Sequence, residues 1–183
     1  MKFKLSDKRI LIPFIIVLLG TILMAATVFM PYGTATNDFQ KELDSLPNAI
    51  ISNEITVSTH DLANRSMADY AKLYAAYSDQ LFSSNEGYVY TGLVIAIAAF
   101  ALLGTLFAIL KKGTPIIVFT CLSVLVFAFQ SFDFSYRGII PSDVYVWGYG
   151  YYVFYIAAAV AIIGAVWLII SKHKIKKENK ISE

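Results

Sequence analysis

The chain has 183 residues, of which 57% are hydrophobic and only 15% are charged, and its formal net charge is +2. About a quarter of the residues in a soluble domain are charged, so this composition excludes an ordinary soluble domain and favours an integral membrane protein. The single cysteine, Cys121, excludes an internal disulfide, a CxxC redox pair and a zinc site built from thiolates.

Four apolar segments are long enough to cross a membrane. The hydrocarbon core is about 30 Å thick and requires roughly 20 apolar residues in a helix, which satisfies its own backbone hydrogen bonds. The spans predicted in this way are residues 10–31, 88–110, 115–134 and 151–170. We therefore expect an all-α integral membrane protein, an antiparallel four-helix transmembrane bundle with a partly helical extracytoplasmic loop.

The first span could instead be a secretory signal peptide, because basic residues precede it and small residues lie near its end. The apolar region of a signal peptide is roughly 7–15 residues long. The apolar run from Ile10 to Met30 has 21 residues, which favours an uncleaved membrane anchor.

Residues 32–87 are the one segment large enough for an extramembrane region. They contain eight acidic and three basic residues, a net charge of −5. This charge is typical of a solvated outer surface. It would also suit a docking face for a basic partner or for cations.

Two amphipathic helices are predicted within this loop. The first ends at Pro47 and has an apolar face of Phe39, Leu43 and Leu46. The second is longer and begins with a capping box at Ser58 and Asp61. Its apolar face consists of Leu62, Tyr70, Leu73, Tyr77 and Leu81. The stretch AIISNEITV between the two helices predicts a short strand or an extended connector.

Residues 111–114 predict a tight turn between the second and third spans. In the sequence KKGTP, Gly113 suits the end of one helix, Thr114 the N-cap of the next and Pro115 its first position. The two helices are therefore expected to form a helical hairpin.

The basic residues predict the orientation of the chain. Eleven of the 15 lie in the tail 1–9, the turn 111–114 and the tail 171–183, and cytoplasmic segments are enriched in lysine and arginine. We therefore expect both termini in the cytoplasm, with the loops 32–87 and 135–150 outside the plasma membrane. The basic C-terminal tail should also touch anionic lipid. The abundance of isoleucine and lysine suggests a bacterial source.

Small residues predict where helices approach one another, because lipid provides no hydrophobic driving force for their association. The second span offers Gly92, Ala96 and Gly104, and the fourth span carries a stripe of Ala157, Ala161, Gly164 and Ala165. We expect these two spans to make the closest contacts, either within the chain or with a second copy.

Aromatic residues are concentrated in the stretch 126–155, around Asp133 and Arg137. Such residues are typical of the membrane–water boundary, so the stretch predicts an interfacial belt. If the third helix continues by one turn, Asp133 and Arg137 lie at i and i+4 and can form an ion pair. The functional alternative is a site for a partner or for lipid, in which the acid holds a cationic group. Its candidate residues are Gln130, Asp133, Tyr136, Arg137 and Trp147.

Two conformations are open for the residues after Pro141. Ser142 could cap a helix that runs straight into the fourth span. Gly148 and Gly150 could instead break the segment into a loop that folds back over the bundle, and we favour the loop.

The sequence contains no zinc-protease, intramembrane aspartyl-protease, serine-hydrolase or phosphate-loop motif. His60 and His173 are expected on opposite sides of the membrane, so no metal site is predicted. We expect a non-catalytic protein without a cofactor and without a nucleic-acid partner. As an accessory, scaffold or protective subunit, it would meet another membrane protein, a second copy of itself or membrane lipid through its outer face. The alternative is a small channel or transporter subunit that acts as an oligomer.

The layout of four spans, a large first outer loop, a tight inner turn and a shorter second outer loop resembles that of claudin-like and tetraspanin-like proteins in topology. The claudin W-GLW-C-C signature is absent, and one cysteine cannot form the loop disulfides of either family. The resemblance therefore implies no residue roles.

Overall fold

The computed structural model of the protein describes residues 8–45, 50–52, 55–56, 62–81 and 86–181. The chain forms two compact units. The helical unit consists of Met1–Ala25, Ala96–Leu125 and Phe154–Glu183, and the mixed unit consists of Ala26–Ile95 and Val126–Val153.

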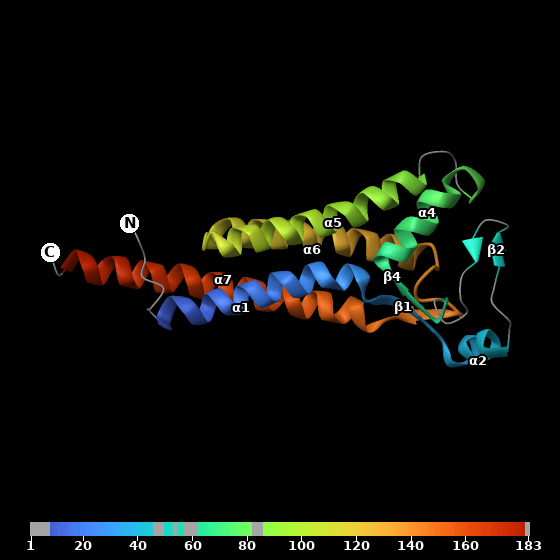
Figure 1. The fold of residues 1–183 in the computed structure, drawn as a ribbon, viewed down its shortest axis with the longest axis horizontal. Helices are drawn as coiled ribbons and strands as arrows, with labels where there is room; N and C mark the ends of the chain where they lie inside the picture. The colour runs from blue at the N-terminus through green and yellow to red at the C-terminus, as the bar shows by residue number, and fades with distance from the viewer. Residues whose placement is uncertain (1–7, 46–49, 53–54, 57–61, 82–85, 182–183) are drawn as a thin grey trace. The chain divides into compact units, whose positions relative to one another are not determined.

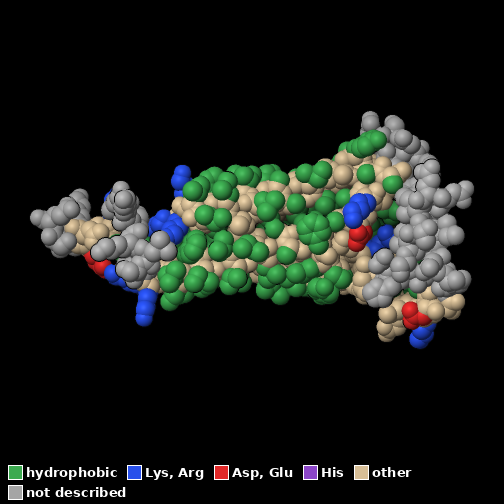
Figure 2. All heavy atoms as spheres, viewed as in Figure 1, with side chains coloured by type: hydrophobic (Ala, Val, Ile, Leu, Met, Phe, Trp, Pro, Cys, Tyr) green, Lys and Arg blue, Asp and Glu red, His purple; other side chains and the backbone are tan. Residues whose placement is uncertain are grey.

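Four helices of the described residues are long and apolar enough to cross a membrane, as the sequence predicted (Figure 1). They are α1 (Lys8–Ala26), α5 (Glu86–Ile109), α6 (Gly113–Tyr136) and α7 (Tyr149–Ile181). A short 3-10 helix, η1 (Thr27–Phe29), follows α1 directly. Many large hydrophobic side chains of these helices are exposed, and hydrophobic side chains (green) are spread over the face seen in Figure 2.

The core of the helical unit brings together side chains from all four helices. Its buried members are Ile10, Val17, Ala108, Ile116, Ala165, Leu168 and Ile175. Within this unit, the start of α1, the end of α7 and the turn between α5 and α6 lie toward the same end (Figure 1).

α7 continues to Ile181, although the sequence predicted the end of the fourth span at residue 170. Lysine is a good helix former, so a basic segment can prolong a helix. Ile175 is buried two turns after Leu168, and Arg9 Nη1 lies 3.0 Å from Glu178 Oε2. The helix therefore continues because its packed face continues.

The turn between α5 and α6 adopts the left-handed conformation at Lys111, with a φ of 56°. The expectation that Gly113 ends the second span is therefore wrong, because Gly113 is the first residue of α6. A Cβ on Gly113 would lie 2.4 Å from Ile169 Cγ1 and 3.1 Å from the Ala165 carbonyl oxygen. Glycine is needed here because α7 passes so close to the turn.

The mixed unit contains β-strands, so the expectation of an all-α protein is wrong in this part of the chain. β1 (Pro31–Ala35) lies between β4 (Asn64–Ser66) and β5 (Tyr145–Trp147) in an antiparallel sheet. Gly33 is opposite Arg65 on one side and opposite Trp147 on the other. The sheet therefore joins three segments that are far apart in the sequence.

Glycines allow the backbone of this sheet to be packed closely. A Cβ on Gly33 would lie 2.7 Å from Ile140 Cδ1 and 2.8 Å from the Tyr70 hydroxyl oxygen. A Cβ on Gly148 would lie 2.3 Å from the Pro31 carbonyl oxygen. Side chains at these two positions would separate β1 from its neighbours.

The residues after Pro141 form a loop and β5 before α7 begins, so the loop is confirmed over the continuous helix, although Gly150 lies inside α7 and only Gly148 precedes it. Ser142 caps no helix. Its N–H donates to the Tyr145 carbonyl at 2.8 Å, and its Oγ accepts from the Tyr145 N–H at 3.0 Å. The Thr36 N–H donates to the Val144 carbonyl at 2.9 Å and so attaches the loop to the end of β1.

α2 (Asn37–Ser45) is the first helix predicted in the long loop. Leu43 is buried with Ala35 and Ala63, and Phe39 packs against them, whereas Leu46 lies outside the described residues. β2 (Ile50–Ser52) and β3 (Ile55–Thr56) pair in antiparallel fashion, which confirms the strand alternative for AIISNEITV.

α4 (Met67–Leu81) begins later than the sequence predicted, because residues 64–66 form β4. Ser58 and Asp61 lie outside the described residues, and Leu62 precedes β4. Of the predicted apolar face, Tyr70 is buried and Leu73 is half-buried, and the side chains of Tyr77 and Leu81 lie outside the described part.

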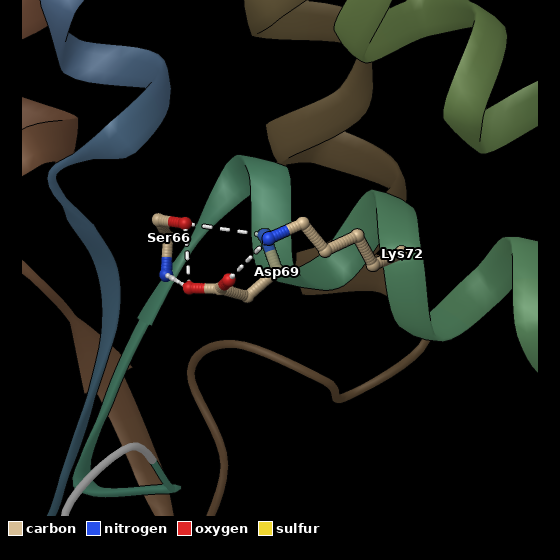
Figure 3. A network of polar contacts seen from close by, with 3 residues as sticks. All are labelled: Ser66, Asp69 and Lys72. Atoms are coloured by element: carbon tan, nitrogen blue, oxygen red, sulfur yellow. Dashed lines mark hydrogen bonds and ion pairs between the residues drawn. The ribbon is translucent and has the colours of Figure 1, made fainter. Parts of the chain in front are cut away.

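Ser66 and Asp69 form the capping box of α4 (Figure 3). The N–H and the hydroxyl of Ser66 donate to Asp69 Oδ2 at 3.1 and 2.6 Å, and the Asp69 N–H donates to Ser66 Oγ at 3.1 Å. Lys72 Nζ lies 3.7 Å from Asp69 Oδ1. This capping box was not predicted from the sequence, and the one expected at Ser58 and Asp61 lies outside the described residues.

Candidate functional site

Asp133 and Arg137 lie one turn apart at the end of α6, because this helix continues to Tyr136. Arg137 Nε lies 3.1 Å from Asp133 Oδ2. The ion pair predicted from the i, i+4 spacing is therefore confirmed.

Tyr90 of α5 completes a group that spacing within one helix could not reveal. Its hydroxyl donates a hydrogen bond to Asp133 Oδ2, and the guanidinium carbon of Arg137 lies 5.3 Å from the centroid of its ring. The ring therefore contacts the acid through its hydroxyl and the base through its face. We refer to Tyr90, Asp133 and Arg137 as the polar triad.

The polar triad is partly exposed, with side-chain exposures of 22% for Asp133 and 38% for Arg137. An ion pair in such a setting stabilises a protein by less than about 1 kcal/mol. The two charges compensate each other, and the carboxylate of Asp133 accepts hydrogen bonds from both partners. The chain itself thus satisfies Asp133, which favours the structural role over a site that holds an external cation.

An aromatic layer supports the polar triad. Tyr74 of α4 stacks on Tyr90 with ring centroids 4.8 Å apart, and Phe134 contacts both rings. Burial raises the pKa of Tyr74 to about 12, because an ionised phenol would lose its hydration. Tyr74 is therefore neutral at ordinary pH. Its stacking on Tyr90 holds α4 to the start of α5.

Gln130 and Tyr136, two of the predicted site residues, do not join the polar triad. Gln130 is 1% exposed, on the same face of α6 as Phe127 and Phe134. Its amide nitrogen and oxygen have no hydrogen-bond partner within the described chain. Tyr136 is 83% exposed and stacks on Phe132.

Trp147 belongs to a second aromatic group, which is centred on Tyr32 of β1. Tyr32 is 1% exposed, its ring is edge-on to Trp147 at 5.3 Å, and its hydroxyl donates to Ser131 Oγ at 2.9 Å. Its ring also contacts Tyr70, Phe127, Phe134 and Tyr151. Sequence reasoning missed this Tyr32 cluster, because a lone tyrosine between Pro31 and Gly33 has no periodic pattern.

The small-residue stripe of α7 packs against α1. Ala157, Ala161, Gly164 and Ala165 are all buried. A Cβ on Gly20 of α1 would lie 2.8 Å from the Ala161 backbone nitrogen, and a Cβ on Gly164 would lie 2.8 Å from Val17 Cγ2. The expectation that the fourth span packs closest against the second is therefore wrong within this chain. Gly20 was missed because it is a single small residue in an apolar run.

The small residues predicted on α5 differ from one another in their surroundings. Gly104 is buried, and a Cβ on it would lie 3.5 Å from Thr21 Cγ2 of α1 and 4.0 Å from Thr120 Oγ1 of α6. Ala96 is half-buried. Gly92 is exposed, and a Cβ on it would meet no described atom within 4 Å. The expectation that Gly92 packs against another helix is therefore wrong for the described residues of this chain.

Among the described residues, no group of three or more His, Cys, Asp or Glu side chains could hold a metal ion. His60 lies outside them, and His173 is exposed on α7. Comparison of the chain with protein-family models, with curated proteins and with solved structures finds no match. Its function is therefore argued from the geometry of its own residues.

Proposed function

We propose that the chain is a non-catalytic, multi-pass protein of a bacterial plasma membrane, with four antiparallel spans and both termini in the cytoplasm. The mixed unit lies on the outer side and provides a rigid platform. Through this platform the chain acts as an accessory, scaffold or protective subunit of a partner membrane protein.

The distribution of side chains along the helices supports insertion in lipid. Leu19, Leu125 and Ile163 are 62%, 65% and 64% exposed, whereas a soluble helix would turn such residues to its core. Beside its large aliphatic core residues, the helical unit buries small and hydroxyl-bearing residues of the kind that membrane helix interfaces contain. Among them are Gly20, Thr21, Thr120, Ser123, Ala157 and Ala161.

Pairs of contacting residues support the antiparallel order. Ser123 Oγ of α6 donates to the Ile97 carbonyl of α5 at 3.1 Å, and Phe119 of α6 stacks on Phe107 of α5 at 5.4 Å. From Phe119 to Ser123 the chain advances along α6, while the contacted residues move back along α5 from Phe107 to Ile97, as in antiparallel helices. The same order holds for α1 and α7, where the contacting pairs are Arg9–Glu178, Val17–Gly164 and Gly20–Ala161.

The charge of the helical unit supports a cytoplasmic location for its basic end. Lys and Arg side chains (blue in Figure 2) gather where α1 begins and α7 ends. The α5–α6 turn adds Lys111 and Lys112 at the same end. Cytoplasmic segments carry this excess of positive charge, so the distribution favours termini inside the cell.

α2 supports a role in binding a partner. Its apolar side is anchored by Leu43, which is buried in the mixed unit. Asp38, Glu42 and Asp44 are exposed, and Lys41 offsets part of their charge through an ion pair of 3.3 Å with Asp38. A fixed acidic face complements a basic segment of a partner protein.

The proposal rests on one observation: the carboxylate of Asp133 accepts hydrogen bonds from Tyr90 and Arg137 within the polar triad. Because Tyr90 and Arg137 contact its carboxylate, Asp133, which lies within α6, serves the rigidity of the mixed unit. The exposed acids of α2 are then among the charged groups that this unit can offer to a partner.

Cross-linking mass spectrometry of the full chain, purified in mild detergent, tests this function. We expect a stable complex with another membrane protein, cross-linked through α2. Asp44→Lys should weaken its capture, whereas Asp143→Lys, the same charge change at an exposed residue before β5, should not. A homo-oligomer that conducts ions in a planar bilayer would favour the channel or transporter alternative, and a solitary monomer would contradict both.

A further inference from the structure

A hollow of about 420 Å³ lies in the helical unit, where the α5–α6 turn passes α7. Four lysines line it: Lys111 and Lys112 from the turn, and Lys172 and Lys176 from α7. Ile169 and Pro115 add an apolar floor. We refer to it as the basic hollow.

Contacts within the chain fix one side of the basic hollow. Lys172 Nζ donates a hydrogen bond to the Lys111 carbonyl, which holds α7 against the turn. Lys111 Nζ lies 5.2 Å from the centroid of the Phe14 ring, a cation–π contact with α1. The turn is thereby held to two helices, and the hollow is shaped before any ligand arrives.

The positive charge of the basic hollow is not balanced by acids of the described chain. Glu178 is the one acidic residue in the described part of the helical unit, and it pairs with Arg9. Lys112 and Lys176 are exposed and have no acidic partner among the described residues. Like charges held together repel, so an anion placed between them is stabilised.

The lining of the basic hollow indicates which anion it suits. The aliphatic stems of the lysines, with Ile169 and Pro115, make its walls apolar below a cationic rim. Val118 of α6 and Ile170 of α7, which are close in sequence to the lining residues, are exposed apolar side chains as well. A free phosphate would use the rim alone, whereas a phospholipid would use the rim for its headgroup and the apolar surface for its acyl chains.

We propose that the basic hollow binds an anionic phospholipid, with the headgroup phosphate held by Lys112 and Lys176. The site rests on the proposed membrane insertion, which brings this end of the helical unit to the cytoplasmic lipid surface. A lysine near an anionic lipid surface contributes about 1 kcal/mol, which corresponds to about a fivefold change in affinity.

The test is native mass spectrometry of the full chain in mild detergent, titrated with phosphatidylglycerol and, separately, with phosphatidylcholine. Lys112→Gln/Lys176→Gln should weaken retention of phosphatidylglycerol about 30-fold. Lys174→Gln/Lys177→Gln also removes two positive charges, both from α7 and outside the basic hollow, and should weaken it less than about threefold. Phosphatidylcholine should be retained equally weakly by all three proteins.

Equal losses in the two double variants, or no loss in either, would overturn the proposal. Displacement of the lipid by an equal concentration of inorganic phosphate would also overturn it, because a free anion would then suffice. The proposed membrane insertion is tested separately by fractionation. Each variant should still sediment with the membrane fraction, and a wild-type chain absent from that fraction would overturn the insertion itself.

Discussion

The Tyr32 hydroxyl donates a hydrogen bond of 2.9 Å to Ser131 Oγ, although the two residues are 99 positions apart in the sequence. Ser131 Oγ donates in turn to the Phe127 carbonyl at 2.8 Å. This chain of hydrogen bonds, enclosed by aromatic rings, fastens β1 to α6. A small sheet is marginally stable by itself, so this attachment accounts for its place in the mixed unit.

Two substitutions of Tyr32 should therefore destabilise the protein to different extents. Tyr32→Phe removes one hydrogen bond and should lower the free energy of unfolding by about 1 kcal/mol. Tyr32→Ala empties the centre of the cluster and should lower it by about 3–5 kcal/mol. Tyr136→Phe, at an exposed hydroxyl, is the control and should have no effect. Equal stability of Tyr32→Phe and Tyr136→Phe in detergent unfolding would contradict the role of the Tyr32–Ser131 bond.

The polar triad predicts graded effects at Asp133. Asp133→Asn keeps an acceptor for Tyr90 but loses the charge opposite Arg137, so it should cost less than about 1 kcal/mol in a half-exposed setting. Asp133→Ala removes both contacts and should cost about 2 kcal/mol. Unfolding in detergent measures both, with Asp143→Asn as the exposed control. Loss of partner capture by Asp133→Asn at unchanged stability would instead identify Asp133 as a binding residue.

The close approach of α1 and α7 predicts opposite outcomes at two glycines. Gly20→Ala forces a methyl group against the Ala161 backbone, and overpacking of this kind costs about 1–3 kcal/mol. Gly92→Ala meets no described atom and should be neutral or stabilising by up to about 1 kcal/mol, since alanine favours a helix over glycine. Thermal unfolding of the two variants provides the comparison. Similar destabilisation by both would refute the assignment of α1 as the partner of α7.

The capping box of α4 predicts a dependence of stability on pH. Burial raises the pKa of Asp69, but the hydrogen bonds from Ser66 and the charges of Lys72 and Arg65 outweigh it, so the pKa is lowered from 3.8. Because the folded pKa lies below the unfolded one, the stabilisation is present above about pH 4 and is lost as the pH falls through the folded pKa.

The variant Asp69→Asn tests this dependence, because its side chain has a similar shape but cannot ionise. Between about pH 6 and pH 3, the wild-type melting temperature should fall more steeply than that of the variant. Identical slopes would show that Asp69 does not contribute. Ser66→Ala should cost about 1 kcal/mol at neutral pH through loss of the cap.

Features that depend on neighbouring residues could be predicted from the sequence. The apolar runs that became α1, α5, α6 and α7 were recognised because length and hydropathy are properties of one segment. The pair Asp133–Arg137 was recognised because its members lie one helical turn apart.

Features that depend on distant residues could not be predicted. β1 contains Pro31 and Gly33, which are unfavourable in strands, and its partners lie at least 30 and at least 110 positions further along the chain. Tyr90 reaches Asp133 only because α5 and α6 pack together. The Ser66–Asp69 box was missed because the strand before it interrupts the helical pattern.

The orientation of the four spans is most directly tested by cysteine labelling. In a chain with Cys121→Ala, Asp44→Cys and Lys112→Cys are introduced separately, and intact cells are treated with a membrane-impermeant maleimide. We expect Asp44→Cys to be labelled in intact cells and Lys112→Cys to be labelled only after the membrane is permeabilised. Labelling of Lys112→Cys in intact cells, with Asp44→Cys protected, would contradict the proposed topology.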